Sequence, residues 1–158
     1  MNNTALSFTN LSYRVSGRTI LENLNLSVPV GSYFAIVDIN GAGKSTLIKL
    51  ALDLIRPNQG SQISIFNNIN REPRCRESLA FLSEKFDTKK DASARQYLQF
   101  VASTYDIPLD KKRVMLLAQK LDFAADRFES KVASYSKGMV QKLGLISCFM
   151  LDRELLIL

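Results

Sequence analysis

Hydrophobic and polar residues alternate in the first part of the chain. In residues 4–15 and again in residues 20–28, apolar side chains recur at about every second position, as they do in half-exposed β-strands. A turn at Gly17 separates the two runs, and Pro29 ends the second run. The pattern predicts two antiparallel strands joined by a short turn.

Short apolar runs follow at 34–37, 62–66, 79–82 and 155–158, and turn residues or polar segments bound most of them. Runs of this kind are typical of strands in the core of a sheet. We expect a strand at 34–37 and a mainly parallel core sheet around the glycine-bearing loop that follows it. The last core strands would be absent or unpaired, which predicts a sticky edge at 155–158 and poor solubility of the chain expressed alone.

From residue 91 onward the apolar period changes to that of a helix. Pro108 separates two helices, and a third begins near Ser136. Such stripes belong to a core more often than to a cofactor site, and we interpret them in this way. The stripe residues are Ala94, Tyr97, Leu98, Val101, Tyr105, Val114, Leu117, Ala118, Leu121, Met139, Leu143, Ile146 and Met150.

The stretch IVDINGAGKSTLIKL, residues 36–50, combines a strand-like run, a glycine-bearing loop and a helix start. This context favours a phosphate-binding loop, because glycines let backbone N–H groups approach an anion and the helix N-terminus adds positive charge. Lys44 would bind the β- and γ-phosphates, and the Ser45 hydroxyl would hold Mg²⁺. A chance Gly-Lys-Ser turn is the alternative, at about one in several thousand chains of this length. The candidate nucleotide contacts are Asp38, Ile39, Asn40, Gly41, Ala42, Gly43, Lys44, Ser45 and Thr46.

One residue departs from the phosphate-loop pattern. Asp38 stands where G-x-x-x-x-G-K-[ST] has its first glycine. It brings a Cβ to a tight turn and a carboxylate that would repel phosphate if it pointed into the loop. The sequence leaves its direction open, and with it the effect on ATP affinity.

Composition narrows the classes of function. The chain has 158 residues, 46% of them hydrophobic, which fits one ordinary domain with a real core. It has no histidine, which excludes every mechanism that needs a histidine base or ligand. The net charge is +6, but lysines and arginines are scattered without interleaved aromatics. We therefore expect a solvated basic surface and no nucleic-acid partner.

The cysteines and the apolar segments indicate in which cellular compartment the chain is expected. Cys75 and Cys148 lack metal-ligand spacing, so reduced cytoplasmic thiols are the expectation. The first fifteen residues do not have the pattern of a signal peptide. The longest nearly apolar run, Leu143 to Leu151, is too short to span a bilayer.

Three further segments, with the phosphate loop, give the chain a family resemblance. ASYSKGMVQKL at 133–143 resembles the signature motif of ATP-binding-cassette (ABC) transporters in its exporter-type variant. Ser83-Glu84 resembles the family's Q-loop with glutamate for glutamine, and Tyr13 matches its adenine-stacking aromatic. The chain thus resembles the ATP-binding subunit of such a transporter from end to end.

The resemblance implies an α/β fold: a P-loop NTPase (RecA-like) core with an N-terminal antiparallel β subdomain and a helical signature subdomain. Residues 1–158 would form one incomplete ATP-binding domain, with the helical subdomain at 91–135 inserted in it. It also implies ATP and Mg²⁺ as cofactors, a second ATP-binding subunit in a head-to-tail dimer, and a separate transmembrane permease. The chain would then be cytoplasmic, on the inner face of the cell membrane.

The resemblance also assigns roles to single residues. Tyr13 would stack on adenine, while Glu84, with Ser45, would reach Mg²⁺ and the attacking water. Four residues would face the ATP held by a partner subunit: Ser136, Lys137, Gly138 and Met139.

The strand at 155–158 resembles the one that leads into an Asp-Glu pair in this family, and the sequence ends before such a pair. We therefore expect the C-terminal part of the core to be missing, and Lys44 and Glu84 to be members of an incomplete catalytic set. Little hydrolysis by this chain alone would follow.

Three functions stay open at this point. The first is the ATPase subunit of an exporter, and the second is a nucleotide-binding fragment or regulatory remnant that does not hydrolyse. The third, an unrelated phosphate-loop enzyme, is disfavoured by the segment Tyr135 to Leu143.

Overall fold

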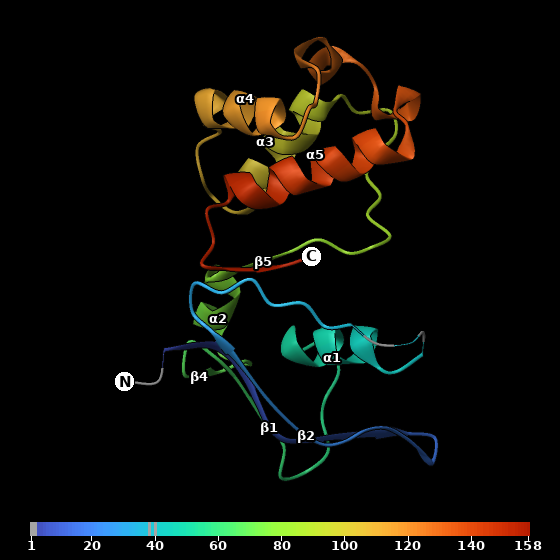
Figure 1. The fold of residues 1–158 in the computed structure, drawn as a ribbon. Coiled ribbons are helices and arrows are strands. Elements are labelled where there is room, and N and C mark those ends of the chain that lie inside the picture. Colours follow the sequence, from blue (N-terminus) through green and yellow to red (C-terminus); the bar gives the residue numbers. More distant parts are fainter. Residues whose placement is uncertain (1–2, 38, 40) are drawn as a thin grey trace. The chain divides into compact units, whose positions relative to one another are not determined.

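The computed structural model describes residues 3–37, 39 and 41–158 of the chain. These residues form two compact units, 1–78 and 79–158 (Figure 1). The expectation of one domain with a helical insertion at 91–135 stays a prediction.

The first unit is built on a four-stranded antiparallel sheet in the order β2-β1-β3-β4. The two long strands are the ones that the alternating pattern predicts, so the N-terminal antiparallel β part is confirmed. The strands are β1 (Thr4–Val15), β2 (Arg18–Pro29), β3 (Gln62–Ile65) and β4 (Asn68–Ile69).

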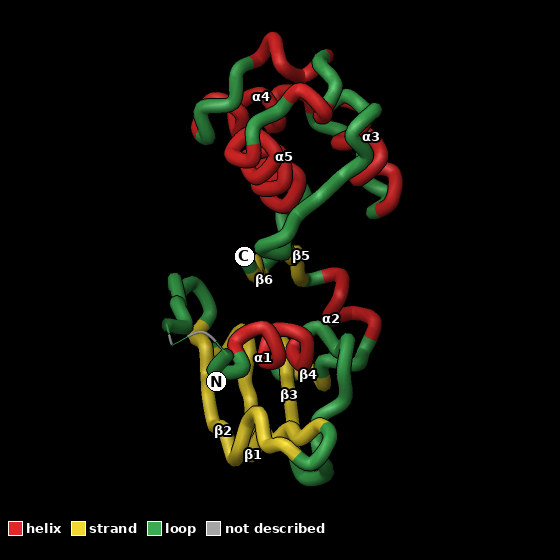
Figure 2. The backbone as a smooth tube through the Cα atoms, turned by 90° about the vertical axis from the view of Figure 1, so that its right-hand side faces the viewer, coloured by secondary structure: helices red, strands yellow, loops and turns green. Residues whose placement is uncertain are grey.

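Helix α1 (Lys44–Ala51) lies against one face of this sheet (Figure 2). Its apolar residues are spaced three and four apart, so they share the face that packs on the strands. The buried residues of this small core are Phe8, Leu11, Leu47, Leu50, Ala51 and Ile63. The core fixes the helix whose first turn follows the glycines of the candidate phosphate loop.

A short helix, α2 (Pro73–Glu77), ends the first unit. Proline suits its first turn because it has no N–H group that needs a partner there. The Cys75 thiol is buried and donates to the carbonyl of Ile69 at 3.2 Å. Burial raises the pKa of the Cys75 thiol, which keeps it protonated as a donor.

The segment at 34–37 differs from the prediction. The structure assigns no strand to residues 32–37, and the exposed fractions of Phe34 and Val37 are 47% and 90%. A strand needs neighbours that pair with it and cover its faces, and propensity alone does not hold one. Within its own unit the segment is not part of the ladder that joins β1 to β2 and β3. The strand expected at 34–37 is therefore absent from the described residues.

The second unit holds one parallel pair of strands, β5 (Leu79–Phe81) and β6 (Leu155–Ile157), in the register Leu79 to Leu155. Both lie where the apolar runs predict core strands. We expected the last core strands to be absent or unpaired, and the second alternative is wrong for the run at 155–158, because β6 pairs with β5. One of the residues expected at a sticky edge, Leu158, has an exposed fraction of 62%.

Helices make up most of the second unit and confirm the change of period at residue 91. Ser93 and Gln96 form a capping box at the first helix, and the Asp110 side chain caps the second. Their inward stripes share one core with Ala80 of β5. The helices are α3 (Ala94–Thr104), α4 (Lys111–Lys120), the short 3₁₀ helices η1 (Ala125–Glu129) and η2 (Val132–Ser134), and α5 (Lys137–Met150). No described helix has the length and apolarity of a membrane-spanning segment.

Candidate functional site

The loop before α1 has the backbone that a phosphate-binding loop needs. Gly41 and Gly43 have φ angles of 88° and 96°, which favour glycine. Gly43 is the N-terminal cap residue of α1, and no side chain in the described part of the chain caps this helix. The first N–H groups of a helix have no carbonyl partner within it, so they attract anions.

Gly43 is also needed for space. A Cβ at this position would lie 3.0 Å from Leu21 Cδ2 and 3.3 Å from the carbonyl oxygen of Ile20. Both neighbours belong to β2, so the loop is seated directly on that strand. The sequence pattern explains the glycine by its φ angle, and the structure adds the close approach of β2.

The side chain of Lys44 folds back over the loop. Its Nζ donates to the carbonyl of Ile39 at 2.9 Å, and the backbone N–H of Ala42 donates to the same oxygen at 3.4 Å. The ammonium group is thus held over the turn through which the backbone reaches α1. Ser45 and Thr46 follow in the first turn of α1, and Ser45 is exposed.

An open groove of ≈ 320 Å³ runs beside this loop, and apolar side chains of β2 and of the segment at 34–37 form much of its wall. The groove therefore offers apolar surface next to an ammonium group and backbone amides, as small-molecule sites do. The lining residues are Leu21, Leu24, Leu26, Phe34, Ala35, Ile36, Val37, Ala42, Gly43, Lys44 and Leu47.

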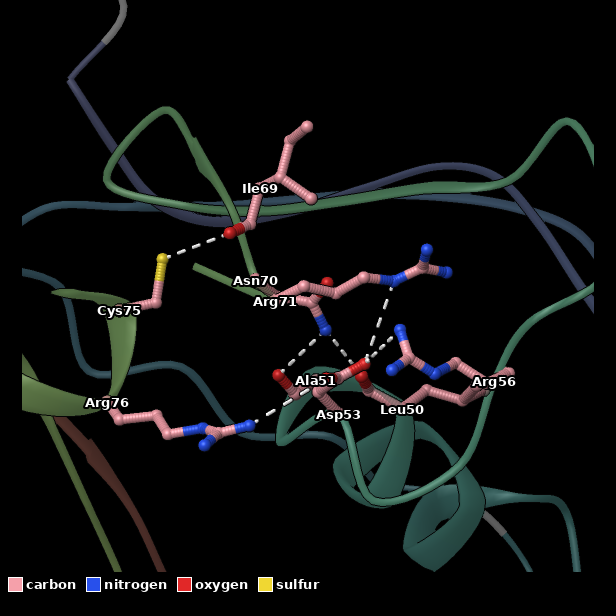
Figure 3. Close-up of polar contacts among 9 residues, drawn as sticks. All are labelled: Leu50, Ala51, Asp53, Arg56, Ile69, Asn70, Arg71, Cys75 and Arg76. Atoms are coloured by element: carbon pink, nitrogen blue, oxygen red, sulfur yellow. Dashed lines mark hydrogen bonds and ion pairs between the residues drawn. The ribbon is translucent and has the colours of Figure 1, made fainter. Parts of the chain in front are cut away.

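The opposite end of α1 is held by a buried amide (Figure 3). The Nδ2 of Asn70, a residue with an exposed fraction of 6%, donates to the carbonyl oxygens of Leu50 and Ala51 at 2.8 and 3.1 Å. The last carbonyls of a helix lack partners within it, and a buried one without a partner is costly. Asn70 provides the donor to the carbonyl of Ala51 and a second donor to that of Leu50, which also accepts the N–H of Asp53 at 3.1 Å, and it thereby fixes the end of this helix.

Three arginines surround Asp53 just beyond the end of α1 (Figure 3). The Asp53 side chain is 7% exposed, and its oxygens lie 3.2 Å from Arg56 Nη1, 3.8 Å from Arg71 Nε and 3.9 Å from Arg76 Nη2. A buried carboxylate needs such partners because water no longer solvates it. The cluster ties the turn after α1 to the segment before and within α2.

Sequence reasoning missed both Asn70 and Asp53. Both lie outside every recognised motif, and Asn70 sits in a polar stretch whose pattern predicts no element. A polar residue that caps a helix twenty positions earlier leaves no local signal. Only the folded backbone shows its role.

Tyr13 lies on β1, opposite Leu21 of β2. Its ring is partly buried and packs against the core beneath α1. The structure thus places it in the same unit as the phosphate loop. Its stacking on adenine stays a prediction.

The signature-like segment starts α5 in the second unit. Ser136 is the N-terminal cap, and its Oγ accepts the N–H of Met139 at 3.2 Å. Lys137 and Gly138 lie in the exposed first turn. The structure confirms the helix start at this serine and does not test whether a partner's ATP binds there.

Glu84 lies in the loop after β5, with its side chain exposed. Its carbonyl accepts the Nε2 of Gln141 at 3.2 Å. Asp38 and Asn40, the two other candidates, lie outside the described residues. The candidates thus fall into two sets, Tyr13 with the phosphate loop in the first unit and Glu84 with residues 136–139 in the second.

The two candidate metal ligands are single residues, Ser45 in the first unit and Glu84 in the second. In the described part of the chain, no group of three or more His, Cys, Asp or Glu residues could hold an ion by itself. Ser45 and Glu84 offer oxygen ligands, which Mg²⁺ prefers, and Mg²⁺ commonly uses few protein ligands together with phosphate oxygens. Their chemistry therefore fits a metal that arrives with a nucleotide.

Comparison with known proteins decides the family. The sequence model described as "ABC transporter" matches residues 21–158. The chain belongs to the ABC transporter family. Its resemblance to ATP-binding subunits is thereby confirmed, and the family is one of ATPases.

Two curated relatives and one solved structure show the extent of the likeness. The ABC transporter ATP-binding protein YhcH of Bacillus subtilis is 29% identical over 98% of this chain and 50% of its own length. The zinc import ATP-binding protein ZnuC of Pseudomonas fluorescens is 27% identical over 100% of this chain and 56% of its own length. The structure titled "Structure of ATP binding subunit of ABC transporter" has a TM-score of 0.83 and 27% identity, covering 97% of this chain and 65% of that chain.

These likenesses confirm the predicted fold class, an α/β ATP-binding fold of the P-loop NTPase kind. The ABC transporter chain spans about half the length of the curated relatives described above.

Proposed function

We propose that this chain binds ATP with Mg²⁺ and couples ATP binding and hydrolysis to transport through a separate membrane permease. The observation that carries the proposal is the phosphate loop: two glycines with positive φ, a helix start that no described side chain caps, and Lys44 Nζ held over the turn. Such a loop binds the phosphates of a nucleotide through backbone amides and one ammonium group.

Each candidate residue has a part in this function. Lys44 would exchange the carbonyl of Ile39 for phosphate oxygens, and Ser45 would hold the metal from the first turn of α1. Bound Mg²⁺ would neutralise charge on the phosphates. Glu84 would orient water at the second unit's loop. Tyr13 would provide a ring face for adenine.

The direction that we propose is export, and a second subunit would complete the site. The segment Ser136 to Met139 supports both, because its sequence resembles the exporter-type variant of the signature and its helix start suits an anion. The relative named for zinc import shows that the family likeness alone does not fix the direction. Two copies bound head to tail, on the cytoplasmic face of the membrane, would place each signature at the other copy's ATP.

A second candidate function is nucleotide binding without hydrolysis. Asp38 favours it, since a carboxylate in place of the loop's first glycine would repel phosphate if it faced the nucleotide. In that case the chain would act as a regulatory or inactive member of the family.

Titration of the purified chain with ATP and Mg²⁺ tests the proposal. We expect binding by the native sequence and a loss of about 10- to 100-fold in Lys44→Ala, as removal of a charged hydrogen bond predicts. Lys49→Ala is the matched control, since Lys49 lies in the last turn of the same helix. Equal binding by native chain and Lys44→Ala would refute a phosphate site at this loop.

A second comparison separates the two candidate functions. Binding that strengthens at least about tenfold in Asp38→Gly, with no hydrolysis beforehand, would favour the non-hydrolysing function. Binding and hydrolysis that barely change would favour the transport ATPase.

A further inference from the structure

The loop after β5 is seated on α5 at a glycine. Gly144 lies in the middle of α5, and a Cβ there would lie 2.7 Å from Leu82 Cδ1 and 2.9 Å from Phe86 Cδ1. Real Cβ atoms essentially never come so close to other atoms, so residues 82 and 86 reach this depth only because position 144 has no side chain. Glycine in a helix interior costs about 1 kcal/mol relative to alanine. The close approach of the loop gives a reason for it.

A second contact lies one turn earlier on the same helix. Gln141 Nε2 donates to the carbonyl of Glu84 at 3.2 Å. The Oε1 of Gln141 is buried and finds no hydrogen-bond partner within residues 3–37, 39 and 41–158. A buried amide with one unsatisfied atom is unfavourable, so packing alone does not explain Gln141. Its side chain is instead held by the hydrogen bond to the carbonyl of Glu84.

The ring of Phe86 is fixed from its other side. It packs edge-on against Tyr97 of α3, with ring centroids 5.7 Å apart. The hydroxyl of Tyr97 lies 3.3 Å from Ser147 Oγ, which itself donates to the carbonyl of Gly144 at 2.7 Å. Phe86 is therefore connected through Tyr97 and Ser147 back to α5, at Gly144.

We infer that Gln141 and Gly144 are positioning residues that dock residues 82–86 onto α5. The docked loop carries Glu84, and the first turn of α5 carries Ser136. The two candidate contacts of the second unit therefore behave as one rigid piece.

The consequence for nucleotide binding rests on the proposed function. If Glu84 contributes to Mg²⁺, loosening the loop weakens the part of ATP affinity that Mg²⁺ adds. It does not change the affinity measured without metal, because the phosphate loop lies outside the second unit. This difference separates a positioning role from a general loss of structure.

The test is hydrogen exchange of the backbone N–H of Leu82, the first residue of the loop, which donates to the carbonyl of Ile157 at 3.0 Å, in the full chain without nucleotide. We expect exchange to rise at least about tenfold in Gly144→Ala and about fivefold in Gln141→Ala, as the docking contacts are lost. Gly138→Ala is the control for helix propensity and leaves loop exchange unchanged, because a Cβ there meets only Ser136 Oγ at 3.9 Å.

Loop exchange equal to that of the native chain in both variants would overturn the inference. Gln141→Ala decides the matter if Gly144→Ala does not fold. ATP titration with Mg²⁺ and with a chelator then tests the consequence: Gln141→Ala should lower only the Mg²⁺-dependent part, by a few-fold. Equal loss in both titrations would overturn the link to Glu84. A native chain that binds no ATP would refute the proposed function and leave the docking result standing.

Discussion

The helix behind the phosphate loop and the helix behind the signature-like segment begin in different ways. The N-terminal cap residue of α1 is Gly43, which has a left-handed backbone conformation. No described side chain caps this helix. α5 begins at Ser136, whose hydroxyl accepts the N–H of Met139. One start depends on backbone shape and the other on a single side-chain oxygen. A substitution should therefore act on geometry at the first start and on one hydrogen bond at the second.

The far ends of the two helices differ as well. The end of α1 is satisfied by the buried amide of Asn70. The end of α5 is reached by Arg113, whose Nη2 donates to the carbonyl of Phe149 at 3.1 Å and to Asp152 at 2.6 Å. Asp152 is exposed, and salt and water weaken exposed ion pairs. The end of α1 should therefore contribute more to stability than the end of α5.

Gly43→Ala should give the largest effect, because it changes the backbone geometry that distinguishes the start of α1 from the start of α5. A Cβ at φ 96° is strained, and it would also press on the backbone oxygen of Ile20. We expect ATP affinity to fall at least about 100-fold, which corresponds to about 2.7 kcal/mol. Calorimetric titration measures it. Gly17→Ala is the control, because Gly17 has φ 76° with nothing within 4 Å, and equal affinities in the two variants would contradict the prediction.

Asn70→Ala tests the end of α1. It removes the amide donor to the carbonyl of Ala51 and one of the two donors to the carbonyl of Leu50, in a buried place. We expect the free energy of unfolding to fall by about 2 kcal/mol. Urea denaturation measures it. Asn68→Ala, which removes one bond to the carbonyl of Phe66, should cost less, and the reverse order would be evidence against a special role of Asn70.

Ser136→Ala tests the start of α5. Loss of the cap should lower the free energy of unfolding by about 1 kcal/mol. Ser93→Ala removes the cap of α3 in the same unit and should cost a similar amount. Under the proposed function, only Ser136→Ala should also weaken ATP-dependent self-association, measured by analytical ultracentrifugation. If both variants associate equally well, Ser136 has no role beyond the cap.

The end of α5 should give the smallest effect, and it should depend on pH. The hydrogen bond and charge of Arg113 lower the pKa of Asp152 below its ordinary 3.8. Its contribution to stability is therefore present above pH 3.8 and is lost as the pH falls through the lowered pKa of the folded state. The melting temperatures of the native chain and Asp152→Asn should differ slightly at pH 7 and converge in strong acid.

Asp106→Asn is the matched control for that variant, since Asp106 is also exposed and has a positive φ of 51°. Asparagine tolerates this backbone, so neither variant introduces strain. A difference for Asp152→Asn that persists unchanged into acid would show that charge is not its cause.

The sequence predicted the structural features that depend on residues adjacent in the chain. The alternation of residues 4–15, the glycine loop before Lys44 and the cap at Ser136 are all written in adjacent positions, and each forms where expected. The apolar run at 34–37 reads like its counterparts at 79–82 and 155–158, yet only those two runs form a strand pair. An apolar pattern shows which residues favour a strand. A strand also needs a second strand to pair with, and the pattern does not show which segment that is.

The contacts that support the candidate sites were beyond prediction for a related reason. Asn70 acts on carbonyls about twenty positions earlier, and Gln141 acts on a carbonyl in a loop that precedes it by fifty-seven positions. Neither has a characteristic neighbour in sequence. Gly144 shows the same limit, since nothing around it distinguishes a glycine that admits a loop from one that merely weakens a helix.

The amide bond of Asn70 also bears on protein engineering. A designer who transplants the glycine loop and α1 into another scaffold would carry over every residue of the recognised motif and leave this partner behind. The graft would present the right amino acids on a helix whose far end is unfinished. The transplantable unit is therefore the motif together with the amide that completes its helix, and a host scaffold should be chosen for its ability to supply such a donor.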